Sequence, residues 1–165
     1  MKIEKQRNDD MDKLAGLIDD AGTAMLTTID DDGKMSSRPM MPLQMDANGS
    51  LWFFTKRDAT DKEAGHNQLN LTFSDDGDGT FISLSGSSKL LRDEAKIKEL
   101  WSPMVRPWFP DGEDDPSLAL LRVDVEGGEY WNSSSSSMVR FATHVISAIA
   151  GREIGIGENK TVRNH

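Results

Sequence analysis

The spacing of apolar residues changes along this chain from a helical to a strand-like period. Within residues 4–20 the apolar side chains recur three or four positions apart, at Met11, Leu14, Leu17 and Ile18. This spacing predicts an amphipathic helix, and Gly22 is a residue that can end it. From residue 23 onward, apolar and polar residues alternate between turn signals such as Asp-Gly and Asn-Gly, which predicts hairpin-linked strands. The predicted strands are 23–29, 35–45, 51–55, 69–75, 80–91, 118–125 and 128–132, the last two separated by a turn at 126–128.

The segments between and after these strands predict helices and irregular chain. Short helices are predicted at 59–67 and 92–101, and a final helix at 138–150. Residues 101–117 contain four prolines and are predicted to be irregular. The serine run 133–137 predicts a loop that ends in a helix-capping serine.

The order of these elements predicts the fold class. Hairpin-linked strands flanked by helices, without a strand–helix–strand rhythm, favour an antiparallel sheet or small barrel over a parallel doubly wound fold. Two prolines, Pro39 and Pro42, fall in the predicted strand 35–45, so this strand is expected at a sheet edge or with a bulge. We expect one domain over 1–165, with a core of about 5–155 and a polar tail at 156–165.

Composition narrows the classes of function. The 165 residues carry a net charge of −9 and no cysteine, which argues against nucleic-acid binding by bulk charge and excludes disulfides and cysteine nucleophiles. The three histidines lie far apart and the acidic clusters lack calcium-loop spacing, so no metal site is expected, and residues 111–115 are interpreted as a solvated turn. The first residues contain no apolar signal region, and the longest apolar stretch, 141–150, is half of the ~20 residues a membrane span needs. These features predict a cytoplasmic protein.

Cations and hydroxyls gather where the apolar strand 51–55 ends. Pairing across the Asn-Gly turn predicts that Arg38 and Thr55 lie at the same end of the sheet, near Thr60 and Lys62. Two cations with hydroxyl donors form a suitable set for a phosphate monoester, which carries about −1.5 to −2 charge. The alternative is a solvated turn in which these cations pair with Asp58 and Asp61.

The order of motifs resembles a known family. Ser-Arg-Pro-Met (37–40), Leu-Trp-Phe-Phe-Thr (51–55), a lysine-bearing turn and Phe-Ile-Ser-Leu-Ser-Gly (81–86) follow one another as in the pyridoxamine 5′-phosphate oxidase-like FMN-binding split barrels. The stretch 108–131, from Trp-Phe-Pro through Asp-Asp-Pro to Tyr-Trp, is similar to the general stress protein 26 branch of that family. The resemblance covers about residues 5–155.

The resemblance implies a six-stranded antiparallel split β-barrel that forms a homodimer, with FMN at the subunit interface. It implies that Arg38 grips the phosphate and that the backbone of Pro39 and Met40 faces the isoalloxazine edge. The other positions that it implies for the cofactor site are Phe54, Thr55, Thr60, Asp61 and Lys62. Trp108 is a further candidate, as a side chain that stacks on the partner's flavin or as an aromatic residue that fills a core or interface.

Two hypotheses on function follow, and the catalytic residues stay unknown in both. The chain lacks the C-terminal Arg-x-His motif of true pyridoxamine phosphate oxidases, so oxidation of that substrate is not expected. The first hypothesis is an FMN-dependent oxidoreductase of unknown substrate, and the second is a non-catalytic flavin-binding stress-response protein that stores or senses the cofactor. Haem or a deazaflavin in the same barrel is a third, less favoured interpretation, because no histidine falls in the cofactor motifs.

Overall fold

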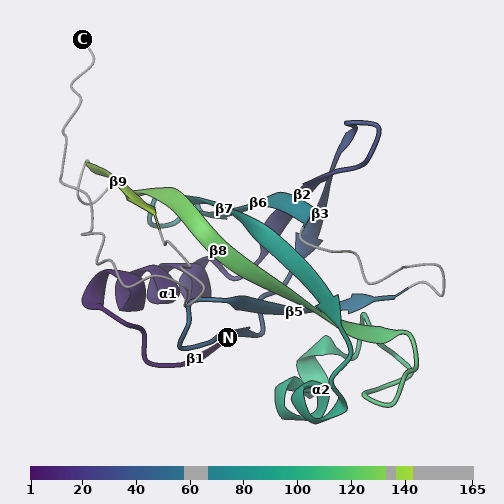
Figure 1. Cartoon of the computed structure of the whole chain (residues 1–165). Coiled ribbons are helices and arrows are strands. Elements are labelled where there is room, and N and C mark those ends of the chain that lie inside the picture. Colours follow the sequence, from purple (N-terminus) through teal and green to yellow (C-terminus); the bar gives the residue numbers. More distant parts are fainter. Residues whose placement is uncertain (58–66, 133–136, 143–165) are drawn as a thin grey trace, which may run out of the picture.

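The protein is a strongly curled β-sheet wrapped around one helix (Figure 1). The structure, a computed structural model, describes residues 1–57, 67–132 and 137–142. Within these ranges the elements are β1 (Lys2–Ile3), α1 (Asp9–Ala21), β2 (Ala24–Ile29), β3 (Met35–Met40), β4 (Gln44–Met45), β5 (Leu51–Lys56), β6 (Asn67–Asp75), β7 (Thr80–Leu91), α2 (Glu94–Leu100), the 3₁₀ turn η1 (Pro103–Val105), β8 (Leu118–Asn132) and β9 (Ser137–Ala142).

The strands form a single sheet that does not close into a complete barrel. Their order is β1-β4-β5-β8-β7-β6-β2-β3, with β9 paired to β8. All neighbours are antiparallel except β1 and β4, which pair in parallel. The prediction of a mainly β fold with flanking helices is confirmed, although the sheet has nine strands in the described residues rather than six. The sequence pattern missed β1 and β9 and merged β4 with β3.

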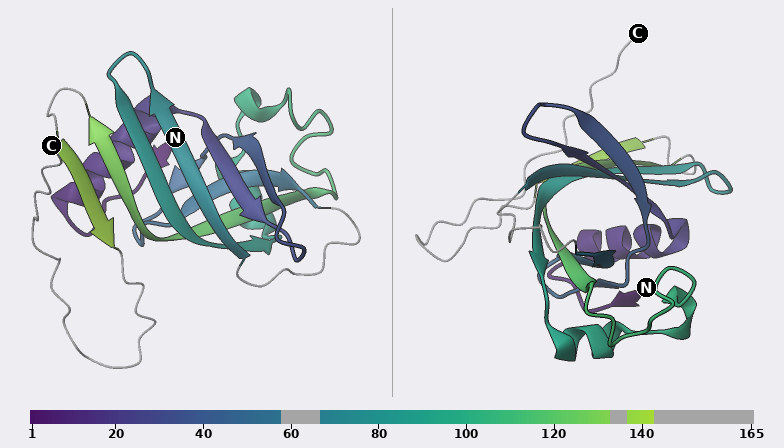
Figure 2. Two further views of the ribbon diagram at one scale, coloured as in Figure 1. Left: turned by 90° about the horizontal axis from the view of Figure 1, so that it is seen from above. Right: turned by 90° about the vertical axis from the view of Figure 1, so that its right-hand side faces the viewer.

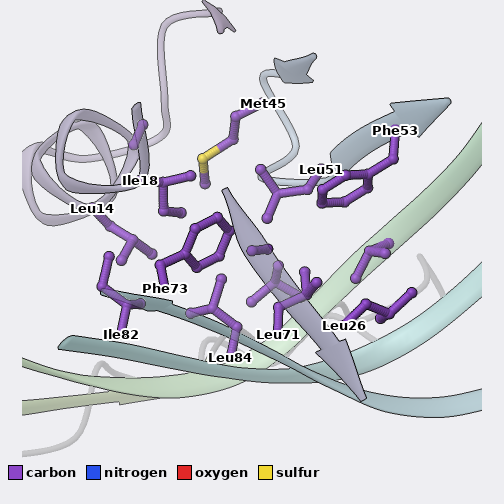
Figure 3. Packing of buried hydrophobic residues seen from close by; sticks show 14 of the residues in the cluster. Leu14, Ile18, Leu26, Met45, Leu51, Phe53, Leu71, Phe73, Ile82 and Leu84 are labelled. Carbon is purple, nitrogen blue, oxygen red and sulfur yellow. The ribbon is translucent and has the colours of Figure 1, made fainter. Parts of the chain in front are cut away.

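The main core lies between α1 and the concave side of the sheet, here called the inner face (Figures 2 and 3). Leu14 and Ile18 of α1 pack against strand residues that include Phe53 and Leu71, all at most 1% exposed. Because alternate strand residues share a face, every second residue of β2 and β5–β8 enters this core.

A second core lies on the opposite, outer face of β5 and β8. There Phe54, Leu118 and Leu120 pack against Ile97 of α2 and Phe109 of the segment that follows it. Strand β5 is therefore covered on both faces, since Leu51 and Phe53 belong to the first core and Phe54 to the second. This explains its nearly continuous apolar sequence.

The N-terminal helix ends where the sequence predicts and starts later. The Asn8 side chain accepts a hydrogen bond from the Met11 N–H at 2.9 Å, which caps the helix and places its first residue at Asp9 rather than near residue 4. Gly22 ends it with φ of 74°, and its N–H donates to the Ile18 carbonyl. The predicted helix 92–101 is confirmed as α2, and 101–117 is irregular apart from η1.

The predicted strand 35–45 is divided into two strands that pair with different neighbours. Its first part, β3, pairs with β2 and forms an edge of the sheet, as expected for a strand that contains Pro39. Its last part, β4, pairs with β5. Residues 41–43, which include Pro42, carry the chain from one strand to the other.

Two predictions in the C-terminal part are wrong. The Gly-Gly turn at 126–128 does not exist, because 118–132 is one strand whose register against β7 shifts at Ser85/Gly86, leaving Glu126 as a bulge. The helix predicted to start at 138 is a strand over Ser137–Ala142, since this segment pairs with β8. The rest of that prediction and serines 133–136 lie outside the described residues, as does the helix predicted at 59–67 except for Asn67, which begins β6.

Candidate functional site

Three predicted cofactor residues lie together on the edge strand β3. Arg38 stands opposite Leu26 of β2, and Met40 stands opposite Ala24. Since Leu26 and Ala24 belong to the main core, Arg38 and Met40 lie on the inner face, while Pro39 between them lies on the outer face. Met40 packs partly against the core, and Arg38 is exposed because no strand lies beyond β3 in the described sheet.

The predicted pair Phe54 and Thr55 closes β5, with the two side chains on opposite faces. Thr55 alternates with the core residue Phe53, lies on the inner face and is half-buried. Phe54 is buried in the second core, with ring centroids 5.9 Å from Trp101 and 5.8 Å from Phe109. The structure therefore brings Thr55, and not the Phe54 ring, to the face that carries Arg38.

The split of the barrel lies between β3 and the second half of β5. On β5, strand β4 pairs with Leu51 and Trp52 alone, so within the described residues β5 from Phe53 onward is paired on its β8 side alone. The four steps from Met40 to Gln44 span at most about 14 Å, which keeps the end of β3 close to this edge of β5. Gln44 of β4 stands opposite Trp52 of the antiparallel strand β5. The chain that precedes Gln44, toward Arg38, and the chain that follows Trp52, toward Thr55, therefore lead to the same end of the sheet.

The charge of Arg38 at this split is not matched by a carboxylate in the part of the chain that the structure describes. Among the described residues no carboxylate lies within ion-pair distance of the Arg38 guanidinium. The other predicted phosphate donors, Thr60 and Lys62, lie outside the described residues, as does Asp61 between them. The alternative pairing with Asp58 and Asp61 falls in the same stretch.

Trp108 is 61% exposed in the turn that follows η1, whereas its neighbour Phe109 is buried against Phe54. Phe109 and Trp101 belong to the second core of this subunit, and Trp108 does not. Of the two roles considered for Trp108, the filling of this subunit's own core is therefore not the one observed. An exposed indole on a turn is a side chain available to a ligand or to another subunit.

The acidic stretch 111–115 contains a structured residue that the sequence interpretation missed. Asp115 is 6% exposed and not part of a solvated turn, because its Oδ1 accepts the Ser117 N–H at 2.8 Å and the Ser117 hydroxyl at 2.7 Å. These two hydrogen bonds hold the pKa of the Asp115 carboxyl below its ordinary value, with smaller contributions from the charges of Lys56 and Arg92. The Asp-Pro-Ser spacing, which suits an Asx turn, is the sequence signal that would have identified it.

The described ranges contain neither a cluster of metal-ligating side chains nor a helix of membrane-spanning length and composition. No group of three or more His, Asp or Glu side chains there is arranged to hold a metal ion. In the same part of the chain, the helices are too short or too polar to cross a membrane.

Comparison with known proteins gives one family and one fold. The model of the family described as "Pyridoxamine 5'-phosphate oxidase like" matches residues 9–155. The general stress FMN/FAD-binding protein of Xanthomonas citri is 30% identical, with a TM-score of 0.62 over 89% of this chain and 97% of that chain. A protein of Clostridium acetobutylicum related to general stress protein 26 shares the fold at a TM-score of 0.67, with 24% identity over 80% of this chain and 93% of that one. Protein bli-3 of Neurospora crassa is 23% identical over 151 residues, which cover 84% of this chain and 72% of the relative.

Proposed function

This chain belongs to the pyridoxamine 5′-phosphate oxidase-like family, and from that premise we propose that it is a flavoprotein that binds FMN in the split between β3 and β5. The observation that carries the proposal is Arg38, an exposed guanidinium without an ion-pair partner among the described residues, on the inner face of the open edge strand. A phosphate monoester is the anion that such a guanidinium, with neighbouring hydroxyls, binds well. The name of the Xanthomonas citri relative as an FMN/FAD-binding protein supports the same cofactor.

The proposal assigns roles to the site residues. Arg38 binds the phosphate with the hydroxyl of Thr55, and Thr60 and Lys62 add a donor and a cation, with Asp61 between them. The backbone of Pro39 and Met40 faces the edge of the isoalloxazine ring, where an edge strand has unpaired backbone groups to offer; Pro39, which has no N–H, can offer only its carbonyl. Phe54 takes part through its backbone, since its ring is buried in the second core.

FMN, once bound, supplies the redox chemistry through its own ring, and the protein supplies binding, orientation and the electrostatic environment. Two functions are compatible with such a site. The first is an oxidoreductase whose substrate is unknown. The second is a non-catalytic stress protein that stores or senses FMN, and it is favoured by the description of the Xanthomonas citri relative, which names binding and no reaction.

We further propose that the protein is a cytoplasmic homodimer with FMN at the interface. Five large apolar side chains of the outer face are exposed, namely Met25, Ile29, Met35, Phe81 and Trp131. The open edge of β3 and this apolar surface are both features that a second copy would cover. In such a dimer the exposed Trp108 of one subunit reaches the flavin of the other.

The experiment that tests FMN binding is a titration of the purified protein with FMN, followed by quenching of flavin fluorescence. The absorbance spectrum and the mass of any small molecule that co-purifies are recorded first. We expect a yellow protein or a protein that takes up one FMN per chain. A colourless protein that leaves the fluorescence of added FMN unchanged would refute the proposal.

The two functions separate in a stopped-flow measurement on the FMN-loaded protein. Rapid bleaching of the flavin by NADH or NADPH, followed by reoxidation by a second substrate, would establish an oxidoreductase. Flavin that stays oxidised with both donors, and shows no reduction by a panel of metabolites, would favour storage or sensing.

A further inference from the structure

The turn at residues 115–118 is fixed from two sides. From within, the Asp115 carboxylate binds the Ser117 N–H and hydroxyl at 2.8 Å and 2.7 Å. From outside, Nη1 of Arg92 lies within hydrogen-bond distance of three carbonyl oxygens, those of Asp115 at 3.2 Å, Pro116 at 2.8 Å and Leu118 at 3.0 Å. Nη1 carries two N–H groups, so at least one of them is shared between carbonyls, and the three carbonyls gather around one cationic nitrogen, which restrains the turn.

This turn is attached directly to the end of β5. The Ser117 carbonyl accepts the Arg57 N–H at 2.7 Å, and the next two residues of β8 pair with Lys56 and Thr55. The Arg57 bond extends the pairing of β5 with β8 by one residue beyond the end of the strand. The position of Thr55 at the split therefore depends on the geometry of the 115–118 turn.

Neither Arg92 nor Asp115 lies on the inner face of the split. Arg92 directly follows β7 and precedes Asp93, the N-cap of α2, so it belongs to the part of the molecule that packs on the outer face. Asp115 is buried in the turn that adjoins the end of β5, close enough to Lys56 for their charges to interact. Both residues act at a distance from any ligand in the split, through the backbone of β5.

We infer that Asp115 and Arg92 are positioning residues that set the phosphate-binding end of the cofactor site, by fixing the backbone of β5 at Thr55–Arg57 through Ser117. The inference rests on the proposed function, because it concerns the site at which FMN is placed. It makes a claim that a purely structural role does not: these residues control the preference for a phosphorylated flavin over an unphosphorylated one. The ring of the flavin lies against β3 in the proposed arrangement, so ring binding does not depend on this turn.

The test compares the dissociation constants of FMN and riboflavin for each variant, because these ligands differ in the phosphate alone. For the wild-type protein we expect tighter binding of FMN than of riboflavin. In Asp115→Ala and Arg92→Met, this preference should fall by roughly tenfold, by analogy with the lower end of the loss seen when groups that orient a metal ligand are removed. Riboflavin affinity should stay within about twofold of the wild-type value, and Asp115→Asn, which keeps the acceptor oxygen, should retain most of the preference.

Matched controls are available in the same segment. Asp114 and Arg106 are exposed neighbours with no side-chain hydrogen bond or ion pair among the described residues, so Asp114→Ala and Arg106→Met should leave the preference unchanged. Ser117→Ala, which removes one of the two donors to Asp115, serves if Asp115→Ala does not fold, and should lower the preference in the same direction by a smaller factor.

The outcomes separate this inference from the proposed function. Wild-type protein that binds neither flavin would defeat the proposed function itself. Wild-type protein that prefers FMN, combined with folded Asp115→Ala and Arg92→Met variants that keep that preference or weaken both flavins equally, would overturn the positioning role alone.

Discussion

Arg38 is the residue on which the phosphate site depends most directly. It lies on the inner face of an edge strand, and no carboxylate of the described residues pairs with it. We expect Arg38→Ala to weaken FMN binding by roughly 10- to 100-fold, since a hydrogen bond to a charged group contributes about 1.5–3 kcal/mol. The melting temperature should stay unchanged. Fluorescence titration and thermal melting measure the two effects, and Arg106→Ala is the control for removal of an exposed arginine.

The two aromatic candidates, Phe54 and Trp108, should behave in opposite ways. Phe54→Leu should lower the free energy of unfolding by about 1–2 kcal/mol, because it loses apolar volume and two ring contacts in the second core. It should leave FMN affinity within about twofold, since only the backbone of Phe54 is proposed to face the cofactor. Trp108→Leu should weaken FMN binding and leave the free energy of unfolding nearly unchanged, because its indole is 61% exposed and is proposed to reach the partner's flavin. Loss of FMN binding in Phe54→Leu with normal stability would contradict this division of roles.

At the scale of elements, the bulge in β8 explains why a glycine is required in the strand that faces it. A Cβ on Gly86 would lie 2.2 Å from the carbonyl oxygen of Asp124, closer than any real contact, and the obstacle is backbone rather than a movable side chain. We expect Gly86→Ala to destabilise the protein by about 1–3 kcal/mol, as overpacking does. A methyl group on Gly16 of α1 would meet no atom within 4 Å beyond the backbone of its own helix, so Gly16→Ala should stabilise by about 0.5–1 kcal/mol through helix propensity. Urea unfolding measures the change in the free energy of unfolding for both variants. Equal changes would rule out the contact between a Cβ at position 86 and the Asp124 carbonyl as the cause.

The turn at Asp115 should make stability depend on pH. Its hydrogen bonds to Ser117 lower the pKa of the folded carboxyl below the ordinary value of 3.8. A group whose pKa is depressed by folding contributes stability above its unfolded pKa, and that contribution is lost as the pH falls through the folded pKa. We therefore expect the stability difference between wild type and Asp115→Asn to be fully present at pH 7 and to shrink below about pH 4. Urea unfolding at a series of pH values measures it, and a difference that stays constant down to pH 2 would show that the charge of Asp115 is not involved.

The elements also show which features the sequence could predict. Alternation and turn residues predicted β2, β5, β6 and β7 and the hairpin turns well, because those signals are local. The Gly-Gly pair at 127–128 suggested a turn, but the long partner β7 on one side and β9 on the other keep this segment in the sheet as a bulge. The strand β9 was mistaken for a helix for a related reason: its conformation is set by pairing with β8, a partner that the local sequence does not reveal.

The same difference between local and distant information applies to the site. Pairing across one hairpin predicted that Arg38 and Thr55 lie at the same end of the sheet. That both side chains also lie on the inner face is known only from the strand register. The contacts of Arg92 and Asp115 could not be predicted in this way, because Arg92 meets carbonyls 23–26 positions along the chain only when α2 and β8 are in place. A cluster of acidic residues is usually solvated. The Asp-Pro-Ser spacing is the one local signal that separates Asp115 from Asp114, whereas the burial of Asp115 and the exposure of Asp114 are set by the fold.

At the scale of the whole molecule, the outer face of the sheet is covered unevenly. Over β5 and the first part of β8 it carries α2 and the segment that follows (Figure 1). Over β2, β3 and the first part of β7 it leaves Met25, Ile29, Met35 and Phe81 exposed. Met25 stands opposite Pro39 of β3, so this apolar surface extends to the open edge that borders the proposed FMN site. A dimer interface on this surface would therefore lie next to the proposed FMN site.

This arrangement makes a prediction about assembly. We expect the wild-type protein to be a dimer at micromolar concentration, and Met25→Glu or Met35→Glu to shift it toward monomer, because each places a carboxylate in an apolar contact. Light scattering coupled to size-exclusion chromatography measures the mass, and FMN affinity should fall in the same variants, since a site at the interface is incomplete in a monomer. Ile3→Glu is the control, because Ile3 is also exposed, at 40%, but lies in β1 at the opposite edge of the sheet. A monomeric wild type, or glutamate variants that dissociate yet bind FMN as tightly as before, would separate the cofactor site from the interface and confine it to the split within one chain.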